Sequence, residues 1–209
     1  MVFESIDVFF QKLNEIGKYV ILRNFEGFPE SIMVEQHPDI DILCENASVF
    51  VNLLDLQNRG NYKDNIHFCV IINEKTVDLD LRQYGDGYYD ESWEHHILEY
   101  RTQYNGIWVP SDEDYFYTLM YHVLIQKKQV AHEYKIRLTE LASRLGILLS
   151  LEDCTLLNEF MRRNQYKYTY PVSPFTTFNS SKADKSLVEK NPIKKVQRIL
   201  AKISRKIGR

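Results

Sequence analysis

Two short segments of alternating aspartates and aliphatic residues constrain this chain of 209 residues more than any other feature. The first is Asp39-Ile40-Asp41-Ile42-Leu43-Cys44, and the second is Thr76-Val77-Asp78-Leu79-Asp80-Leu81-Arg82. Because successive side chains of a strand point to opposite faces, the aspartates of each segment share one face and the aliphatic residues share the other. Each segment is therefore predicted to be a strand with one acidic and one apolar face.

Carboxylates at neighbouring positions on one face repel each other unless a cation lies between them. A single Asp-x-Asp pair on an edge strand needs no explanation beyond solubility, so either segment alone indicates little. If the two strands are sheet neighbours with matching faces, three or four carboxylates converge. Such a cluster predicts a site for Mg²⁺ or Mn²⁺, which prefer oxygen ligands. The alternative is that the two pairs face solvent on opposite sides of the sheet, where they form no site.

The composition is that of an ordinary globular protein, with 44% hydrophobic and 26% charged residues. Its three cysteines, Cys44, Cys69 and Cys154, are isolated in the sequence. This spacing argues against a disulfide framework or a CxxC zinc site and indicates a reducing compartment. No apolar run reaches the length of a membrane-spanning helix, and the N-terminus lacks a basic region followed by an apolar one. A cytoplasmic location is therefore expected.

The charge is distributed unevenly along the chain. The last 20 residues, 190 to 209, contain eight basic residues and no acidic one, which leaves 18 basic against 29 acidic residues in the first 189. The tail is predicted to form a basic amphipathic helix, because its apolar residues fall on one helical stripe. These are Ile193, Val196, Ile199, Leu200, Ile203 and Ile207. Such a helix binds an anionic membrane, nucleic acid or an acidic partner.

Periodicity and turn residues predict an α+β chain. Helices are expected at residues 5–16, 47–56, 91–100, 111–128, 133–145 and 151–164, and strands at residues 18–23, 39–44, 66–72, 76–81 and 107–109. The expected organisation is a core with a small mixed β-sheet and flanking helices at residues 1–110, a helical subdomain at 111–164, a linker at 165–190 and the basic amphipathic helix at 191–209.

The order of a helix, a strand, an Asp-x-Asp strand and a later acidic strand resembles the core of the DNA polymerase β-like nucleotidyltransferase superfamily. The resemblance covers about residues 18 to 128. Its motifs, at residues 22–26, 39–43 and 77–82 with the trailing Gly85-Asp86-Gly87-Tyr88-Tyr89, look like those of nucleotidyltransferase-like proteins encoded among surface-polysaccharide genes. The resemblance implies transfer of a nucleotidyl or phosphoryl-type group from a nucleotide or other phosphate donor to a small molecule or glycan.

By this resemblance, Asp39 and Asp41 would bridge two cations, and Asp78 would bind the cation that activates the acceptor hydroxyl. Asp80 is the alternative for that third position. The candidate phosphate-binding residues are Arg23, Asn24, Arg82 and Lys128. For Arg82 a salt bridge to one of the aspartates is an equal alternative. Arg23 and Asn24 stand where the superfamily has Gly-Ser or Gly-Gly to cradle a triphosphate, so the resemblance does not extend to the donor site.

The acceptors of polysaccharide-assembly enzymes are often lipid-linked, so the resemblance favours a membrane partner for Lys190 to Arg209 over nucleic acid. It implies a peripheral location at the inner face of the membrane. Two other functions stay open from the sequence. One is a toxin-type nucleotidyltransferase that modifies RNA or protein, and the other is a non-catalytic binding or scaffold protein with a degenerate nucleotidyltransferase fold.

Overall fold

The computed structural model describes residues 1–30, 39–59, 66–127, 130–171, 176–179, 181–191, 196 and 199–200. In chain order its elements are β1 (Val2–Phe3), α1 (Ile6–Ile16), β2 (Tyr19–Ile21), β3 (Asp39–Cys44), α2 (Ala47–Leu54), β4 (Gln57–Asn58), β5 (His67–Ile72), β6 (Lys75–Gln83), α3 (Glu91–Glu99), β7 (Thr102–Tyr104), β8 (Ile107–Val109), α4 (Asp112–Tyr121), a π-helical turn (His122–Gln126), α5 (His132–Leu145) and α6 (Thr155–Arg163). Across these ranges the chain is mixed α/β, with one six-stranded mixed sheet and six α-helices, which confirms the predicted combination of a mixed sheet with helices.

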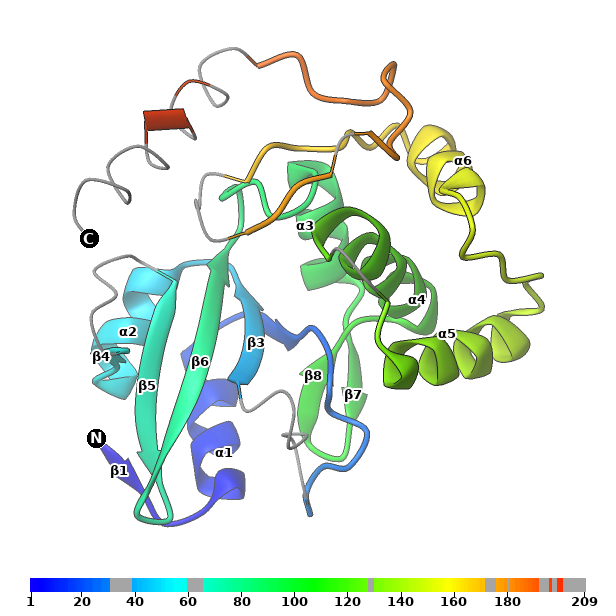
Figure 1. Cartoon of the computed structure of the whole chain (residues 1–209). Coiled ribbons are helices and arrows are strands. Elements are labelled where there is room, and N and C mark those ends of the chain that lie inside the picture. The colour runs from blue at the N-terminus through cyan, green and yellow to red at the C-terminus, as the bar shows by residue number, and fades with distance from the viewer. Residues whose placement is uncertain are drawn as a thin grey trace. The chain divides into compact units, whose positions relative to one another are not determined.

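The described chain divides into two compact units. The first consists of Met1–Tyr84 and His95–Ser111, and the second of Gly85–Glu94 and Asp112–Arg209. The six-stranded sheet belongs entirely to the first unit (Figure 1). Helices α4, α5 and α6 belong to the second unit.

The two acidic strands are neighbours at the centre of the sheet. The strand order is β1-β5-β6-β3-β2, and β4 pairs with the outer edge of β5. Strands β3 and β6 run parallel, with Asp39 opposite Asp78 and Asp41 opposite Asp80. Because paired residues share a face, all four carboxylates lie on the same side of the sheet. The expectation that the two Asp-x-Asp strands are neighbours with matching faces is thereby confirmed.

The opposite face of the sheet is apolar. Ile40, Ile42, Leu79 and Leu81 are all buried. Figure 1 shows α1 and α2 behind the sheet, and these helices bury the side chains Phe9, Phe10, Leu13, Ala47, Phe50 and Leu54. A slip of one residue in the strand register would exchange this apolar face for the carboxylates. Burial of the aliphatic residues therefore fixes the side on which the aspartates lie.

The connection between β5 and β6 is a tight two-residue turn. Asn73 and Glu74 both have positive φ values, 49° and 61°, as the type I′ hairpin turn requires. The sequence predicts a three-residue connection that includes Lys75, but Lys75 already pairs with Ile72. The short turn places His67 opposite Asp80 on the acidic face.

A second hairpin, β7–β8, holds the loop that follows β2. The Tyr104 hydroxyl donates a hydrogen bond to the Glu26 carbonyl oxygen at 2.8 Å, and the Asn105 side-chain amide donates to the Phe28 carbonyl oxygen at 2.7 Å. Asn24, at the start of this loop, is buried and has a φ of 62°, a conformation that asparagine tolerates well. The hairpin thus anchors the segment that begins directly after Arg23.

The second unit has an aromatic core. Tyr89 and Trp93 have ring centroids 4.9 Å apart, and Trp93 stacks on Tyr166 at 5.6 Å. The Trp93 indole N–H donates to the buried Asp114 carboxylate at 2.9 Å. Residues 165–190, where the sequence predicts a linker, contribute buried side chains such as Tyr166 and Tyr168.

The buried Glu94 carboxylate organises the glycine- and tyrosine-rich segment of this unit. It accepts the backbone N–H of Gly85 at 2.7 Å and that of Tyr89 at 2.9 Å. Burial raises the pKa of Glu94 well above its ordinary value, and the neighbouring Asp86 carboxylate adds to the increase. The Gly85–Tyr89 motif therefore has a structural partner within its own unit.

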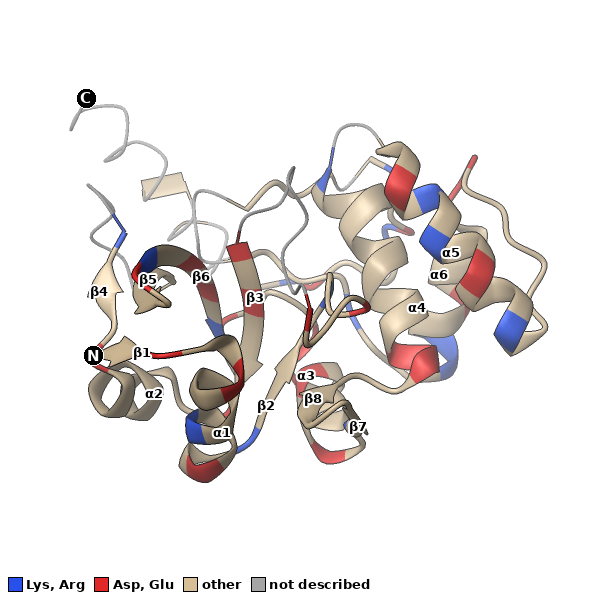
Figure 2. Ribbon diagram, turned by 90° about the horizontal axis from the view of Figure 1, so that it is seen from below, with Lys and Arg blue, Asp and Glu red and all other residues tan. Residues whose placement is uncertain are grey.

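Most of the predicted tail helix at 191–209 lies outside the described residues. Of its described residues, Val196, Ile199 and Leu200 are exposed. Among the helices of the described ranges, none has the length and apolar character needed to span a bilayer. Figure 2 shows acidic positions on β3 and β6, and basic and acidic residues intermixed on α5 and α6.

Replacing Glu94 with glutamine is expected to lower the free energy of unfolding by about 1 to 3 kcal/mol, because the amide offers one acceptor oxygen to two backbone N–H donors. Urea denaturation followed by near-ultraviolet circular dichroism of the aromatic core would measure the loss. The exposed Glu91 on the same helix provides the control, and Glu91→Gln should change stability by less than about 0.5 kcal/mol. Equal effects of the two substitutions would contradict this role of Glu94.

Candidate metal centre

A row of polar side chains crosses four neighbouring strands on the acidic face. Asp41 on β3 is opposite Asp80 on β6, and Asp80 is opposite His67 on β5. Arg59 follows β4 directly, and its backbone N–H donates to the His67 carbonyl oxygen at 3.1 Å. The backbone register alone therefore sets two acids, a histidine and an arginine side by side.

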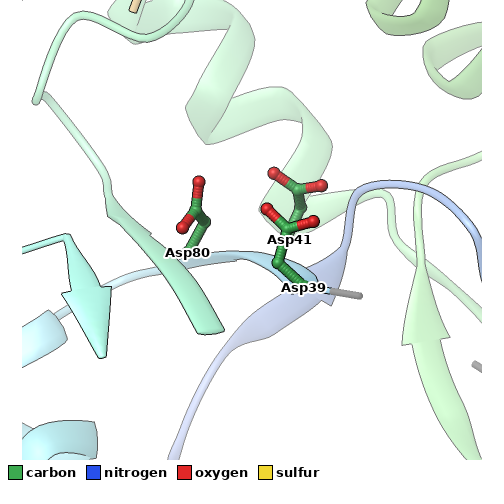
Figure 3. Close-up of side chains that lie close together, drawn as sticks. All are labelled: Asp39, Asp41 and Asp80. Atoms are coloured by element: carbon green, nitrogen blue, oxygen red, sulfur yellow. The ribbon is translucent and has the colours of Figure 1, made fainter. Parts of the chain in front are cut away.

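Three carboxylates come close enough to share a cation. One oxygen from each of Asp39, Asp41 and Asp80 lies within 4.8 Å of the others, and all three side chains point to the same side of the sheet (Figure 3). Opposite ligands are about 4.2 Å apart around Mg²⁺ and about 4.6 to 5.2 Å apart around Ca²⁺. The cluster therefore accommodates a divalent ion with small side-chain adjustments. Carboxylate oxygens suit Mg²⁺, Mn²⁺ and Ca²⁺ alike, so the donor set does not select among them.

Asp80 is the electrostatically strained member of the cluster. Burial raises its pKa to about 6, and the neighbouring charges of Asp41 and Asp39 contribute to the increase, while Arg82 and His67 oppose it. Its Oδ1 atom is buried and accepts no hydrogen bond from the described residues. A carboxylate whose pKa is raised by burial and by like charges is typical of functional sites.

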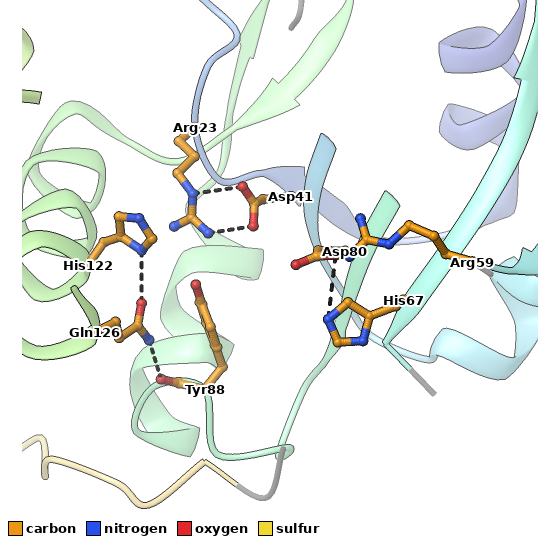
Figure 4. A network of polar contacts seen from close by, with 8 residues as sticks. All are labelled: Arg23, Asp41, Arg59, His67, Asp80, Tyr88, His122 and Gln126. Atoms are coloured by element: carbon orange, nitrogen blue, oxygen red, sulfur yellow. Dashed lines mark hydrogen bonds and ion pairs between the residues drawn. The ribbon is translucent and has the colours of Figure 1, made fainter. Parts of the chain in front are cut away.

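Asp41 is held by a buried arginine. The Arg23 Nε–H donates to Asp41 Oδ2 at 2.7 Å, and Arg23 Nη2 donates to Asp41 Oδ1 (Figure 4). The two side chains are only 6% and 9% exposed. Because each carboxylate oxygen has two lone pairs, this bidentate pairing still leaves acceptor capacity toward a cation. Arg23, predicted as a phosphate-binding residue, is thus engaged with a predicted metal ligand.

Asp78 and Asp80 share a second arginine. Arg59 Nη1 lies 3.3 Å from Asp78 Oδ2, and Arg59 Nη2 lies 3.4 Å from Asp80 Oδ1. His67 Nε2 lies 3.9 Å from the same Asp80 oxygen (Figure 4). The cluster of three therefore contains Asp80, whereas Asp78, the third ligand in the sequence-based assignment, stands beside it in an ion pair.

The other predicted site residues lie in different settings. Arg82 is buried on the acidic face, two positions after Asp80, where its charge lowers the pKa of that carboxyl. Asn24 is a buried turn residue. Lys128 lies outside the described residues.

His122 belongs to the second unit. It begins the π-helical turn, and its Nδ1 lies 3.1 Å from Gln126 Oε1. The Gln126 amide in turn donates to the Tyr88 carbonyl oxygen at 3.4 Å (Figure 4). Isolated π-turns are frequent at functional sites, but His122 takes part in a buried polar network with Gln126 and the Tyr88 carbonyl oxygen.

Arg59 and His67 are missing from the sequence-based site. For His67 a signal exists, because a two-residue turn at Asn73 and Glu74 would have fixed its register opposite Asp80. For Arg59 there is almost none, because β4 has two residues and the sequence reads as the end of a helix there. An arginine just after so short a strand carries no periodic pattern.

Comparison of the chain with protein-family models, with curated proteins and with solved structures finds no match. The observations that bear on function are therefore the residues of the acidic face and the resemblance of the sequence motifs.

Replacing Asp80 with asparagine is expected to stabilise the metal-free protein at pH 8 by up to about 3 kcal/mol. In the folded state the pKa of Asp80 is raised to about 6, so its proton contributes stability at low pH that is lost as the pH rises through 6. The asparagine variant does not lose this stability as the pH rises. The difference in free energy of unfolding between the variant and the wild type should therefore shrink as the pH falls from 6 to 4. Urea denaturation in a chelator across this pH range measures the difference.

Asp78→Asn is the matched control on the same strand and face. Its carboxylate is 34% exposed and paired with Arg59, so the substitution should bring no gain at pH 8. An Asp80→Asn variant that is less stable than the wild type at pH 8, or whose gain does not vary with pH, would refute the assigned strain.

Proposed function

We propose that this protein is a metal-dependent transferase that moves a nucleotidyl or phosphoryl-type group from a nucleotide or other phosphate donor to a small molecule or glycan. The observation that carries the proposal is the gathering of Asp39, Asp41 and Asp80 on one face of the sheet, with oxygens within 4.8 Å of one another. The raised pKa of Asp80 supports it, because the fold keeps a carboxylate where a neutral side chain would be more stable.

In this proposal Asp39, Asp41 and Asp80 would hold Mg²⁺ or Mn²⁺, and the ion would neutralise charge at phosphate and acidify the acceptor hydroxyl. The hydroxyl oxygen forms a bond to phosphorus, and the bond from phosphorus to the leaving oxygen breaks. The leaving oxygen keeps the electron pair, and the hydroxyl proton passes to a carboxylate of the face or to water. Arg23 keeps Asp41 in one orientation through its two hydrogen bonds.

The donor and acceptor classes are proposed from the motifs at residues 22–26, 39–43 and 77–82, which resemble nucleotidyltransferase-like proteins among polysaccharide genes. Arg82 is the proposed phosphate contact that was already indicated by the sequence. Arg82 is buried on the acidic face, so its guanidinium is already largely removed from water. Binding of a phosphate group would therefore cost little further desolvation of this arginine.

A non-catalytic binding or scaffold protein is the second candidate, and one observation favours it. Arg23 pairs with Asp41, Arg59 pairs with Asp78 and Asp80, and the charge of Arg82 acts on Asp80. Three arginines thus offset most of the charge of four carboxylates without any cation. These ion pairs reduce the repulsion among the carboxylates, so the acidic face does not by itself require a metal.

Calorimetric titration with Mn²⁺ separates the two candidates. The wild type is expected to bind the ion, and Asp39→Asn and Asp80→Asn should each weaken binding by at least about tenfold. Asp78→Asn should stay within a few-fold of the wild type. Asp41 is not substituted, because Asp41→Asn would remove the carboxylate charge beside the buried Arg23 and destabilise the fold. A loss of ion binding could then not be distinguished from unfolding. No ion binding by the folded wild type would reject the transferase proposal.

For the basic tail we propose an anionic membrane surface, with the protein at the inner face of the membrane. Each Lys or Arg near such a surface contributes about 1 kcal/mol, and Lys190 to Arg209 contains eight. Flotation with vesicles that contain phosphatidylserine should carry the full chain, and a version that ends at Glu189 should stay at the bottom. Equal partitioning of the two, or equal binding to neutral vesicles, would exclude this role.

A further inference from the structure

Two arginines of the acidic face, Arg23 and Arg59, differ in the length and burial of their contacts with the carboxylates. Arg23 makes a buried, bidentate pair with one carboxylate, Asp41, and is 6% exposed. Arg59 divides its two terminal nitrogens between Asp78 and Asp80, at 3.3 and 3.4 Å, and is 23% exposed. Charge-assisted hydrogen bonds are usually about 2.7 to 2.9 Å long, so these two contacts of Arg59 are longer than that. Arg59 is thus the more exposed of the two arginines and lies farther from its acidic partners.

The partner that Arg59 would lose is Asp80. Asp80 belongs to the carboxylate cluster, whereas Asp78 does not. A cation held by Asp39, Asp41 and Asp80 would take up the charge of Asp80 and repel the guanidinium nitrogen beside it. Asp78 would still hold the other terminal nitrogen. Arg59 would therefore stay at the edge of the cluster through Asp78, with its positive guanidinium beside the cation.

We propose that Arg59 binds the anionic phosphate group of the donor, and that Asp78 is the residue that positions Arg59 for this contact; the inference rests on the proposed function. A phosphate group bound at this edge would bring negative charge to both positive groups and reduce the repulsion between them. Arginine offers its nitrogens in a planar fork that fits phosphate. Asp78 then has a role on the acidic face without being a metal ligand.

The arrangement couples the two ligands. Arg59 disfavours the cation when it binds alone, because it competes for Asp80, and favours the anion once the cation is present. Removal of Arg59 should therefore affect the two ligands with opposite signs. A purely structural salt bridge would not do so, since its loss would weaken the binding of both ligands or of neither.

The experiment is calorimetric titration of the full chain with Mg²⁺ alone, and with inorganic pyrophosphate at saturating Mg²⁺. Arg59→Gln should bind Mg²⁺ as well as the wild type or more tightly, and should bind pyrophosphate about tenfold to a hundredfold more weakly. Arg59→Lys, which keeps the charge without the fork, should lie between them. Arg144→Gln is the matched control, because Arg144 also pairs at 3.3 Å with one aspartate, Asp112, in the second unit.

A double-substitution cycle tests the part assigned to Asp78. Asp78→Asn alone should weaken pyrophosphate binding, and it should have no further effect in the Arg59→Gln background, because both changes remove the same contact. If Asp78→Asn weakens the binding of Mg²⁺ alone as strongly as Asp80→Asn does, Asp78 is a metal ligand and the positioning role is wrong.

The outcomes separate this inference from the proposed function. A wild type that binds Mg²⁺ and pyrophosphate together, with an Arg59→Gln variant that does the same, would overturn the role of Arg59 and leave the transferase proposal standing. Parallel loss of both ligands in Arg59→Gln would also overturn it. A wild type that binds neither ligand would overturn the proposed function itself.

Discussion

The parallel pairing of β3 and β6 is the constraint on which the candidate site depends. With Asp39 opposite Asp78 and Asp41 opposite Asp80, four carboxylates meet on one face. Like charges at such positions destabilise a sheet, so the register must be imposed by something else. The buried aliphatic residues between the aspartates impose it, because Ile40 and Leu79 are paired and almost fully buried on the other face. Burial of the apolar face thus sets the positions of the aspartates, and other residues compensate their charge.

Arginine side chains compensate most of the negative charge of these four aspartates. Arg23 donates two hydrogen bonds to Asp41, and Arg59 spans Asp78 and Asp80. The compensation is incomplete at Asp80, whose pKa is raised to about 6 despite the nearby Arg82. A buried carboxylate in this state lowers the stability of the fold at neutral pH. The remaining electrostatic cost is concentrated on one member of the three-carboxylate cluster, which is where a cation would relieve it.

Much of this arrangement follows from the sequence, and the rest depends on tertiary pairing. Period-two alternation predicts both acidic strands and their faces, and the predicted helices at residues 5–16 and 47–56 are found as α1 and α2. The two-residue β4 is too short for any periodic signal, so Arg59 could not be assigned to the acidic face. Likewise, no local pattern shows that β3 and β6 are parallel, because that depends on the intervening chain.

The difference between Asp78 and Asp80 shows the limit of a periodic argument. In the sequence both are aspartates between aliphatic residues, on the same face of the same strand, and they are equivalent. Their neighbours make them different, because Asp80 lies opposite Asp41 and beside His67, whereas Asp78 is 34% exposed and lies 3.3 Å from Arg59. One arginine contacts both. A ligand that changes the charge at Asp80 is therefore expected to act on Arg59 as well, because Arg59 lies 3.4 Å from Asp80 and 3.3 Å from Asp78.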